Sequence, residues 1–248
     1  YLLVTGWGLV VAVQYVGGNT VVYGQAIEVG TVLFGLYGVL LWWFYRRVDR
    51  YAHQSRVMLV LAAIWGGLGA TLALAAPANT PILSLWGKAF GQAWASDWGA
   101  GLTAPFVEEL AKGAGLVLLV ALAPRAVATA FDGFVLGAFI GLGFQIVEDL
   151  TYVIGSAGLQ FGANPVGNAA STIALRIALG VASHAVYSAI FCTGLVYALG
   201  TPAQPRRLGR GLLLVLTAMV FHGVWDVDGA LFGRNGVLLV LSWIVLSA

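Results

Sequence analysis

The segment Pro105-Phe106-Val107-Glu108-Glu109-Leu110-Ala111-Lys112 places two adjacent carboxylates and an amine inside an apolar run that continues to Leu122. Each ionised side chain near the centre of a bilayer costs roughly 2.5–3.5 kcal/mol on insertion scales. Such residues are retained in a membrane only when they have partners. The segment therefore predicts that other apolar stretches of the chain bring polar side chains to it.

The overall composition indicates a polytopic membrane protein. Of the 248 residues, 60% are hydrophobic and 9% are charged, whereas soluble domains are about a quarter charged. The 34 glycines indicate close contact between apolar helices. The single cysteine, Cys192, excludes a disulfide within the chain and is expected to be a small buried hydrophobe. A net charge of +2 is too small to imply a nucleic-acid partner, so the expected surroundings are the lipid bilayer.

The predicted fold is all-α, a single integral-membrane domain over residues 1–248 built as a transmembrane helix bundle of about eight spans. Runs of about 20 apolar residues are long enough to cross a bilayer. They occur at 1–17, 25–45, 57–76, 102–122, 131–154, 171–199 and 211–229, with an eighth from Gly236 to Ala248. The chain then divides into N-terminal spans at 1–76, an outside interfacial loop at 77–100, spans four to seven within 101–229 and a last span at 236–248.

The distribution of arginine predicts how the bundle is oriented. Eight arginines fall in three loops that an even number of spans separates, namely Arg46, Arg47, Arg50, Arg56, Arg125, Arg206, Arg207 and Arg210. The loops of the opposite side carry only Lys88 and Arg234. Cytoplasmic loops are enriched in Lys and Arg. We therefore expect a multi-pass protein of the cell membrane with its N-terminus in the cytoplasm.

The loop 77–100 carries aromatic residues at every fourth position, at Trp86, Phe90, Trp94 and Trp98. This spacing is typical of an amphipathic helix that lies in the headgroup layer as an aromatic anchor. A lid that faces a substrate is the second interpretation.

Polar side chains occur in four successive spans. They are Glu108, Glu109 and Lys112 in span four, Glu148 and Asp149 in span five, Arg176, His184 and Ser188 in span six, and His222 and Asp226 in span seven. At about 1.5 Å of rise per residue, these positions share one slab at the centre and outer half of the bilayer. We therefore expect one site between spans four and seven.

Spacing within the spans supports this site. Glu108 and Lys112 are four residues apart, as are His222 and Asp226, so each pair shares a helix face. Gly133, Gly137 and Gly141 form a stripe that permits close packing of another helix against span five.

The charges of the predicted site do not balance. Five carboxylates near the bilayer centre would cost on the order of 15 kcal/mol without partners. The cations available are Lys112 and Arg176, and Arg176 is expected either to pair with a carboxylate or to reach the outer headgroups. Protonation or a bound divalent cation would remove the acidic surplus. Two histidines with Glu and Asp are N and O donors suited to Zn²⁺.

These residues resemble a known family. Glu108-Glu109-x-x-Lys112, Phe144-x-x-x-Glu148, His184 and His222-x-x-x-Asp226 are similar, in order, to the four motifs of PrsW-type intramembrane proteases. That family is a branch of the superfamily of type II CAAX prenyl endopeptidases. The match covers residues 105–226. One departure is Asp149, where the family usually has Asn.

The resemblance implies a membrane-embedded metalloprotease with a catalytic core at 101–229. Its best-known substrates are membrane-anchored anti-sigma factors, so the expected partner is a single-pass membrane protein cut on the extracytoplasmic side. Glu148, His184 and His222 are then expected to hold Zn²⁺ or another divalent metal, with Asp226 orienting His222 or completing the metal shell. The expected catalytic residues are Glu108 as general base, Glu109 as supporting acid or further ligand, and Lys112, which keeps Glu108 ionised.

Three alternatives stay open at this point. In a metal-free protease, Glu108 and Glu148 activate water while His222 and Asp226 stabilise the oxyanion. A proton-coupled transporter also places acids and histidines in a membrane interior, but it typically shows an internal repeat. A non-catalytic membrane scaffold would be expected to lack the full acidic set.

Overall fold

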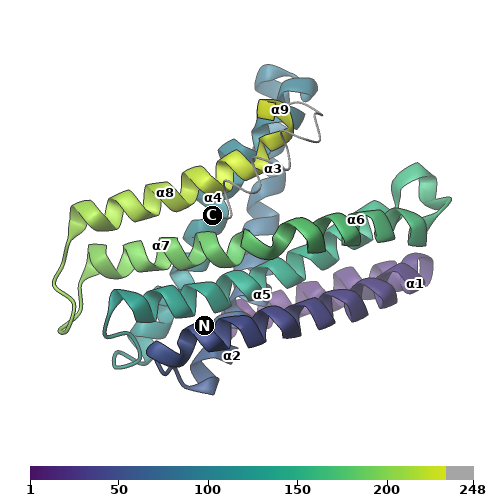
Figure 1. The fold of residues 1–248 in the computed structure, drawn as a ribbon. Coiled ribbons are helices and arrows are strands. Elements are labelled where there is room, and N and C mark those ends of the chain that lie inside the picture. Colours follow the sequence, from purple (N-terminus) through teal and green to yellow (C-terminus); the bar gives the residue numbers. More distant parts are fainter. Residues whose placement is uncertain (233–248) are drawn as a thin grey trace.

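The computed structural model describes residues 1–232, which are helical apart from short connections (Figure 1). The predicted eighth span at 236–248 lies outside the described residues. The helices are α1 (Leu2–Val48), α2 (Arg56–Ile64), a π-helical stretch (Trp65–Ala75), α3 (Ala76–Phe90), α4 (Gln92–Leu122), α5 (Ala130–Ala157), α6 (Pro165–Leu179), α7 (His184–Leu199), α8 (Leu208–Asp226) and α9 (Asp228–Phe232). The all-α prediction is confirmed for this part of the chain.

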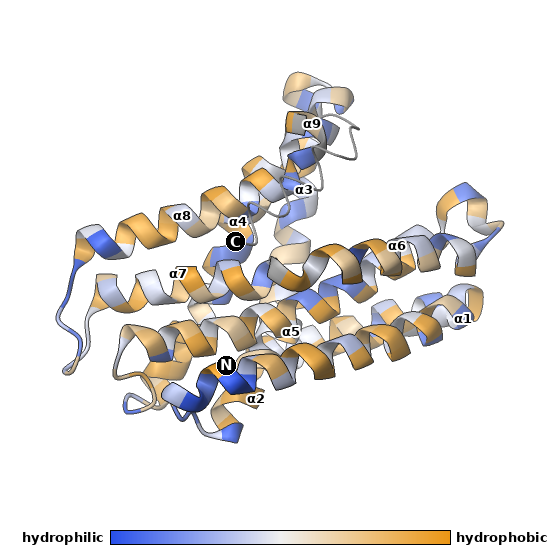
Figure 2. Cartoon of the chain, viewed as in Figure 1, coloured by the Kyte–Doolittle hydropathy of each residue, from blue (hydrophilic) through white to orange (hydrophobic). Residues whose placement is uncertain are grey.

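Several of these helices suit a membrane. Four stretches of the described residues are long and apolar enough to cross one: Leu2–Tyr51, Arg56–Phe90, Ala130–Ala157 and Leu208–Asp226. Helices α6 and α7, bent by 45° at their junction, form a fifth if they count as one broken span. The helices are coloured mostly hydrophobic in Figure 2. The chain is a multi-pass membrane protein, and the number of about eight spans stays a prediction.

Helix α1 contains both of the first two predicted spans, 1–17 and 25–45. Its backbone leaves the helical conformation at Tyr23, where the chain turns so that the second half runs back (Figure 1). The start of α1 is fixed to α2 by a hydrogen bond of 2.5 Å from Tyr1 Oη to the carbonyl of Leu61. The end of α1 packs on α5, with the rings of Tyr45 and Phe139 6.4 Å apart.

Helix α5 lies at the centre of the bundle, in contact with α1, α2, α6 and α7 (Figure 1). The predicted glycine stripe makes the closest of these contacts possible. A Cβ atom added at Gly137 would lie 2.4 Å from the carbonyl oxygen of Ser188, and one at Gly141 would lie 2.3 Å from that of His184. The packing role of the stripe is confirmed, and it brings the backbone of α7 against α5 beside the predicted site. Cys192 is fully buried on the same face of α7, as predicted.

The π-helical stretch ties α4 to the same core. Its sequence, WGGLGATLALA, is rich in small residues, and a Cβ atom at Gly66 would lie only 1.9 Å from the carbonyl oxygen of Ile140. The indole N–H of Trp65 donates a hydrogen bond of 2.9 Å to the carbonyl of Ala111 in α4. The π-helical stretch, which precedes α3, thus packs on α5 and also binds α4, which follows α3.

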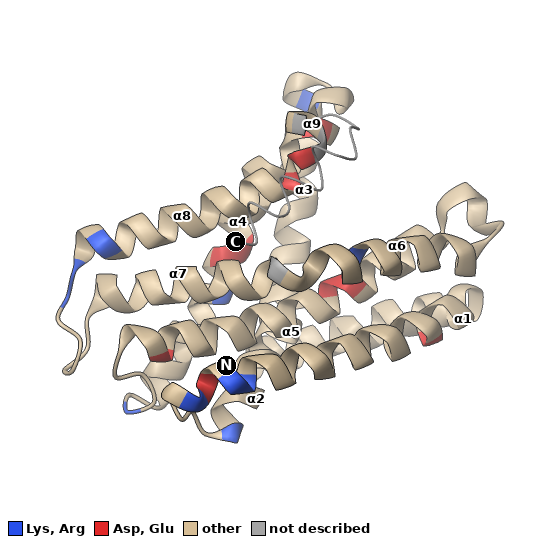
Figure 3. Cartoon of the chain, in the orientation of Figure 1, with Lys and Arg blue, Asp and Glu red and all other residues tan. Residues whose placement is uncertain are grey.

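The three arginine-rich loops lie together at one end of the bundle. The side-chain amide of Gln54 donates to the carbonyl of Ala126 and to Asp132, each at 2.8 Å. Thr201 donates to the carbonyl of Ala128. Figure 3 shows Lys and Arg gathered at this end. This arrangement agrees with the prediction that these loops lie on one side of the membrane.

One predicted segment agrees with the structure in being helical, and another differs from it. The segment 77–100 is helical except at Gly91, where φ is +91°; it forms most of α3 and the start of α4, with Trp86, Phe90 and Trp94 clustered at the turn. The run 171–199 is not one straight span, because a 3₁₀ turn at Gly180–Ala182 breaks it just before His184. Gln145 holds this break by donating to the carbonyl of Gly180 at 2.8 Å.

Candidate active site

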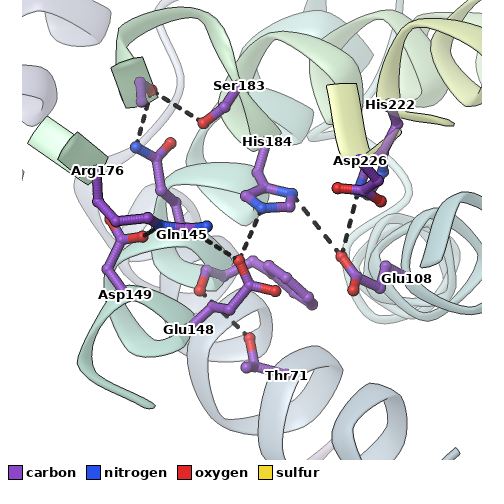
Figure 4. A network of polar contacts seen from close by, with 12 residues as sticks. Thr71, Glu108, Gln145, Glu148, Asp149, Arg176, Ser183, His184, His222 and Asp226 are labelled. Atoms are coloured by element: carbon purple, nitrogen blue, oxygen red, sulfur yellow. Dashed lines mark hydrogen bonds and ion pairs between the residues drawn. The ribbon is translucent and has the colours of Figure 1, made fainter. Parts of the chain in front are cut away.

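Helices α4, α5, α7 and α8 bring the polar residues of the predicted spans into one buried cluster (Figure 4). Glu109, Lys112 and His222 have no exposed surface, and Glu108 and His184 are 3% and 4% exposed. Burial of so many charged groups is tolerated only when they contact one another. The prediction that the four spans share one site agrees with this arrangement.

Each of the two histidines is held through one ring nitrogen by a carboxylate. His184 Nε2 lies 2.9 Å from Glu148 Oε2, and His222 Nδ1 lies 3.0 Å from Glu109 Oε1. An ionised carboxylate only accepts hydrogen bonds, so these two nitrogens carry the hydrogens. The other nitrogen of each ring, His184 Nδ1 and His222 Nε2, then presents a lone pair.

Both of these lone pairs face Glu108. Glu108 Oε2 lies 3.8 Å from His184 Nδ1 and 3.6 Å from His222 Nε2. Asp226 Oδ2 lies 3.5 Å from the same nitrogen of His222. Among the described residues, neither His222 Nε2 nor Asp226 Oδ2 has a hydrogen-bond partner, although both atoms are buried. Acceptors that lie close together without a donor repel one another, so the pair of His222 Nε2 and Asp226 Oδ2 suits a cation or a proton placed beside it.

The donor set itself fits a metal ion. The ligand atoms of Glu108, His184 and His222 all lie within 4.8 Å of one another. Two imidazole nitrogens and a carboxylate oxygen are common ligands of catalytic zinc. Metal-bound histidines usually donate their second N–H to a carboxylate, as both histidines do here.

Lys112 supplies positive charge to this cluster. Its ammonium lies 2.8 Å from Glu109 Oε1, 3.5 Å from Glu108 Oε2 and 3.0 Å from His184 Nδ1. It also sits 3.8 Å from the centre of the Phe144 ring. The predicted ion pair between Glu108 and Lys112 exists, but Glu109 makes the closer contact.

Arg176 of α6 pairs with carboxylates, which was one of its two predicted roles. Its guanidinium lies 2.7 Å from Glu148 Oε2, contacts Asp149, and stacks 4.2 Å over the ring of Tyr152. Figure 4 shows Glu148 between Arg176 and His184. Asp149, the residue that departs from the family pattern, therefore shares the cation of Arg176 with Glu148.

The predicted assignment of these residues as metal ligands or as the general base stays a prediction, because distances alone do not test a catalytic role. Glu148, expected as a metal ligand, contacts Arg176 and the far nitrogen of His184. Glu108, expected as the general base, is the carboxylate near both His184 Nδ1 and His222 Nε2. Asp226 lies beside His222 at a distance compatible with either of its expected roles.

Two further polar residues complete the cluster. Ser188 Oγ donates to Glu109 Oε2 at 3.1 Å. Asn79, in α3, donates from Nδ2 to Glu108 Oε1 at 3.0 Å. Sequence reasoning assigns Asn79 no role, because it lies in the segment predicted as an outside loop and belongs to no motif. Its only signal is a polar side chain within one turn of a predicted span end.

A cavity of about 180 Å³ opens onto the cluster. Its wall includes Asn79 and Leu83 from α3, Tyr152 from α5 and Asp226 from α8, in addition to Glu108 and the two histidines. The side chains of Arg176, Asp226 and Glu148 are 21%, 18% and 15% exposed. The part of the cavity that they line is therefore more open than its floor, which is formed by Glu108 and the two histidines. The arrangement can hold water next to several carboxylates inside an apolar bundle.

Comparison with known protein families gives one match. Residues 54–248 match the PrsW family intramembrane metalloprotease. No curated protein and no solved structure matches the chain.

Proposed function

The chain belongs to the PrsW family of intramembrane metalloproteases, and from this premise we propose that it hydrolyses a peptide bond of a single-pass membrane protein in the extracytoplasmic half of the bilayer. The expected substrate is a membrane-anchored regulator of the anti-sigma-factor type. The observation that carries the proposal is the convergence of Glu108 Oε2, His184 Nδ1 and His222 Nε2 at the floor of one buried cavity.

The depth of the site supports cleavage in the outer half. From the arginine-rich end, α4 reaches Glu108 and α8 reaches His222 after about 21 Å of helix each, at about 1.5 Å per residue. The hydrocarbon core is about 30 Å thick. Since arginine-rich loops favour the cytoplasm, the cluster would lie beyond the midplane on the extracytoplasmic side, and the N-terminus would be cytoplasmic.

Glu108, His184 and His222 are the residues that would hold a divalent metal, with Zn²⁺ as the best candidate. When bound, such an ion polarises a carbonyl group and makes a nearby water more acidic. Glu148 and Glu109 would fix the two imidazole rings in the required orientation. Lys112 would have to release His184 Nδ1, because one lone pair cannot serve both an ammonium group and a metal ion.

Hydrolysis requires a group that moves a proton. The water oxygen adds to the carbonyl carbon, the C–N bond breaks, and the proton taken from the water passes to the leaving amine. With Glu108 engaged as a ligand, Asp226 is the carboxylate suited to this transfer. Its Oδ2 accepts no hydrogen bond from the described residues, and its side chain lies on the more open side of the cavity.

A metal-free protease is the second candidate, and the contact of 3.0 Å between Lys112 and His184 favours it. In this version the ammonium group supplies the positive charge and Glu108 takes the proton from water. A proton on His222 Nε2 or on Asp226 Oδ2, which lie 3.5 Å apart, would then be donated in a hydrogen bond to the oxyanion.

Reconstitution of the protein in liposomes with a library of synthetic single-pass transmembrane peptides tests the proposal. We expect the wild-type protein to cleave a subset of the peptides, as detected by mass spectrometry, and Glu108→Gln to reduce cleavage at least 100-fold. Glu28→Gln, a change at an exposed position of α1, is the matched control and should leave cleavage unchanged.

The metal content of the same samples separates the two versions. Loss of bound zinc in Glu108→Gln assigns Glu108 as a ligand, and retention of zinc assigns it as the base. A wild-type enzyme that is active without metal selects the metal-free version. Cleavage by Glu108→Gln at the wild-type rate would reject the proposed site.

A further inference from the structure

Helix α3 contributes one side chain to a site otherwise built by later helices. Asn79 Nδ2 donates a hydrogen bond of 3.0 Å to Glu108 Oε1. Because an ionised carboxylate only accepts hydrogen bonds, this contact fixes which way the amide group is turned. The nitrogen faces Glu108, and the carbonyl oxygen, Oδ1, faces away from it.

Asn79 Oδ1 is a buried acceptor in need of a donor. No described residue donates to it, and the atom has almost no solvent-accessible surface. A buried acceptor left without a partner costs about 1–3 kcal/mol. Asn79 nevertheless lines the cavity that also contains Glu108 and the two histidines, so a substrate that displaces the side chains covering Oδ1 can supply the missing donor.

A substrate peptide brings such a donor. Cleavage requires the peptide backbone to be accessible, and unwinding a helix frees N–H groups that have no water to bind inside a bilayer. Each freed group needs a partner supplied by the enzyme. The other polar atoms on the floor of the cavity belong to carboxylates and imidazoles that already contact one another, whereas Asn79 Oδ1 is a neutral acceptor.

The position of Asn79 on the wall also suits this role. Asn79 and Leu83 line the cavity from α3, and Tyr152 and Arg176 line it from α5 and α6. Tyr152 is 49% exposed, so the cavity is accessible along the α5 side. A peptide segment that enters past Tyr152 would lie in the cavity that Asn79 lines.

We propose that Asn79 is a substrate-positioning residue, whose Oδ1 accepts a main-chain N–H of the unwound substrate next to the bond that is cleaved. The inference rests on the proposed proteolytic function. The contact with Glu108 holds the amide of Asn79 in place. Because Asn79 would contact both Glu108 and the substrate, it would fix the position of the substrate backbone relative to this carboxylate.

Amide-to-ester scanning of a substrate tests this contact directly. The probe is the shortest library peptide that the wild-type enzyme cleaves in liposomes, remade with a single backbone N–H replaced by an ester oxygen at each position near the cut. In the wild-type enzyme, one ester should lower kcat/KM about tenfold, mainly through KM, because one hydrogen bond is lost. In Asn79→Leu the same ester should have no further effect, although overall activity is lower.

Two controls keep the result specific. Thr103→Val changes another residue of the cavity wall whose hydroxyl already accepts from Trp86 at 3.0 Å, and it should show the wild-type ester profile. Asn79→Gln retains both the amide donor and the acceptor oxygen and should retain the ester effect. If Asn79→Leu is inactive, the affinities of amide and ester peptides are compared in Glu108→Gln protein with Asn or Leu at position 79.

The outcomes are distinguishable. An ester profile that is the same in the wild-type enzyme and in Asn79→Leu would overturn the role of Asn79 and leave the protease intact. A wild-type protein that cleaves no peptide of the library would overturn the proposed function and this inference with it.

Discussion

The ammonium of Lys112 lies 3.0 Å from Nδ1 of His184, one of the two imidazole nitrogens that face Glu108. An amine and a metal ion cannot share this lone pair. The same amine is 2.8 Å from Glu109, which holds His222 from the other side. Lys112 is therefore the residue that links both halves of the site and the one that competes with a metal for it.

Zinc should stabilise the protein if Glu108, His184 and His222 hold it. At a free concentration of 100 times Kd, binding to the folded state adds about 2.7 kcal/mol, which appears as a rise in Tm of the purified protein in detergent. His222→Ala should abolish the rise. His53→Ala removes the one other histidine of the chain outside the site, at an exposed position, and should preserve it. A rise of equal size in His222→Ala would contradict the assignment.

Removal of the Lys112 charge should destabilise the fold. Lys112→Met leaves the fully buried carboxylate of Glu109 without its cation, and breaking a buried ion pair on one side costs about 3–5 kcal/mol. Thermal unfolding in detergent measures this loss. Lys88→Met, a change of an exposed lysine in α3, is the control and should unfold as the wild-type protein does. Equal unfolding of the two variants would show that Lys112 does not carry this stabilisation.

Arg176 should affect the site through His184. It contacts Glu148 and Asp149 together, and Glu148 orients the His184 ring. Arg176→Lys cannot reproduce both contacts, because lysine lacks the planar fork. We expect zinc affinity or kcat to fall about 10–100-fold in a metal titration and a cleavage assay. Arg210→Lys, at the arginine-rich end, should leave both values unchanged, and unchanged values in Arg176→Lys would contradict this role.

Gly141 should be intolerant of a side chain. A Cβ atom there would lie 2.3 Å from the carbonyl oxygen of His184, so Gly141→Ala must push α7 away from α5 and displace the imidazole. Overpacking of this kind costs about 1–3 kcal/mol, and activity should fall with stability. Gly155→Ala is the matched control on the same helix, where an added Cβ atom meets no atom within 4 Å. Normal activity and Tm in Gly141→Ala would show that α5 and α7 can move apart at this contact without loss of stability or activity.

Much of the site could be predicted because charge in an apolar segment is costly. Glu108, Glu148, His184 and His222 each stand out against their span, and the spacing of four residues between His222 and Asp226 fixes a shared face. Helix depth then predicts one slab. None of these features depends on knowing how the helices pack, which is why the cluster follows from the sequence.

The roles within the cluster required the tertiary structure. Sequence spacing cannot tell which nitrogen of His184 faces which carboxylate, and the packing of α7 on Gly141 decides that Glu148 takes Nε2 while Glu108 faces Nδ1. The break before His184 likewise depends on a distant residue, because Gln145 binds the carbonyl of Gly180.

The sequence by itself determined that this is an apolar all-helical bundle with acids, histidines and a lysine at one depth, since each of those properties follows from composition and from helical periodicity. Only the tertiary structure brought Asn79 to Glu108. The stretch Trp65–Ala75 has π-helical hydrogen bonds, which change the angle per residue and therefore the face that α3 presents. The same stretch packs closely against α5, a contact between segments that are remote in the sequence.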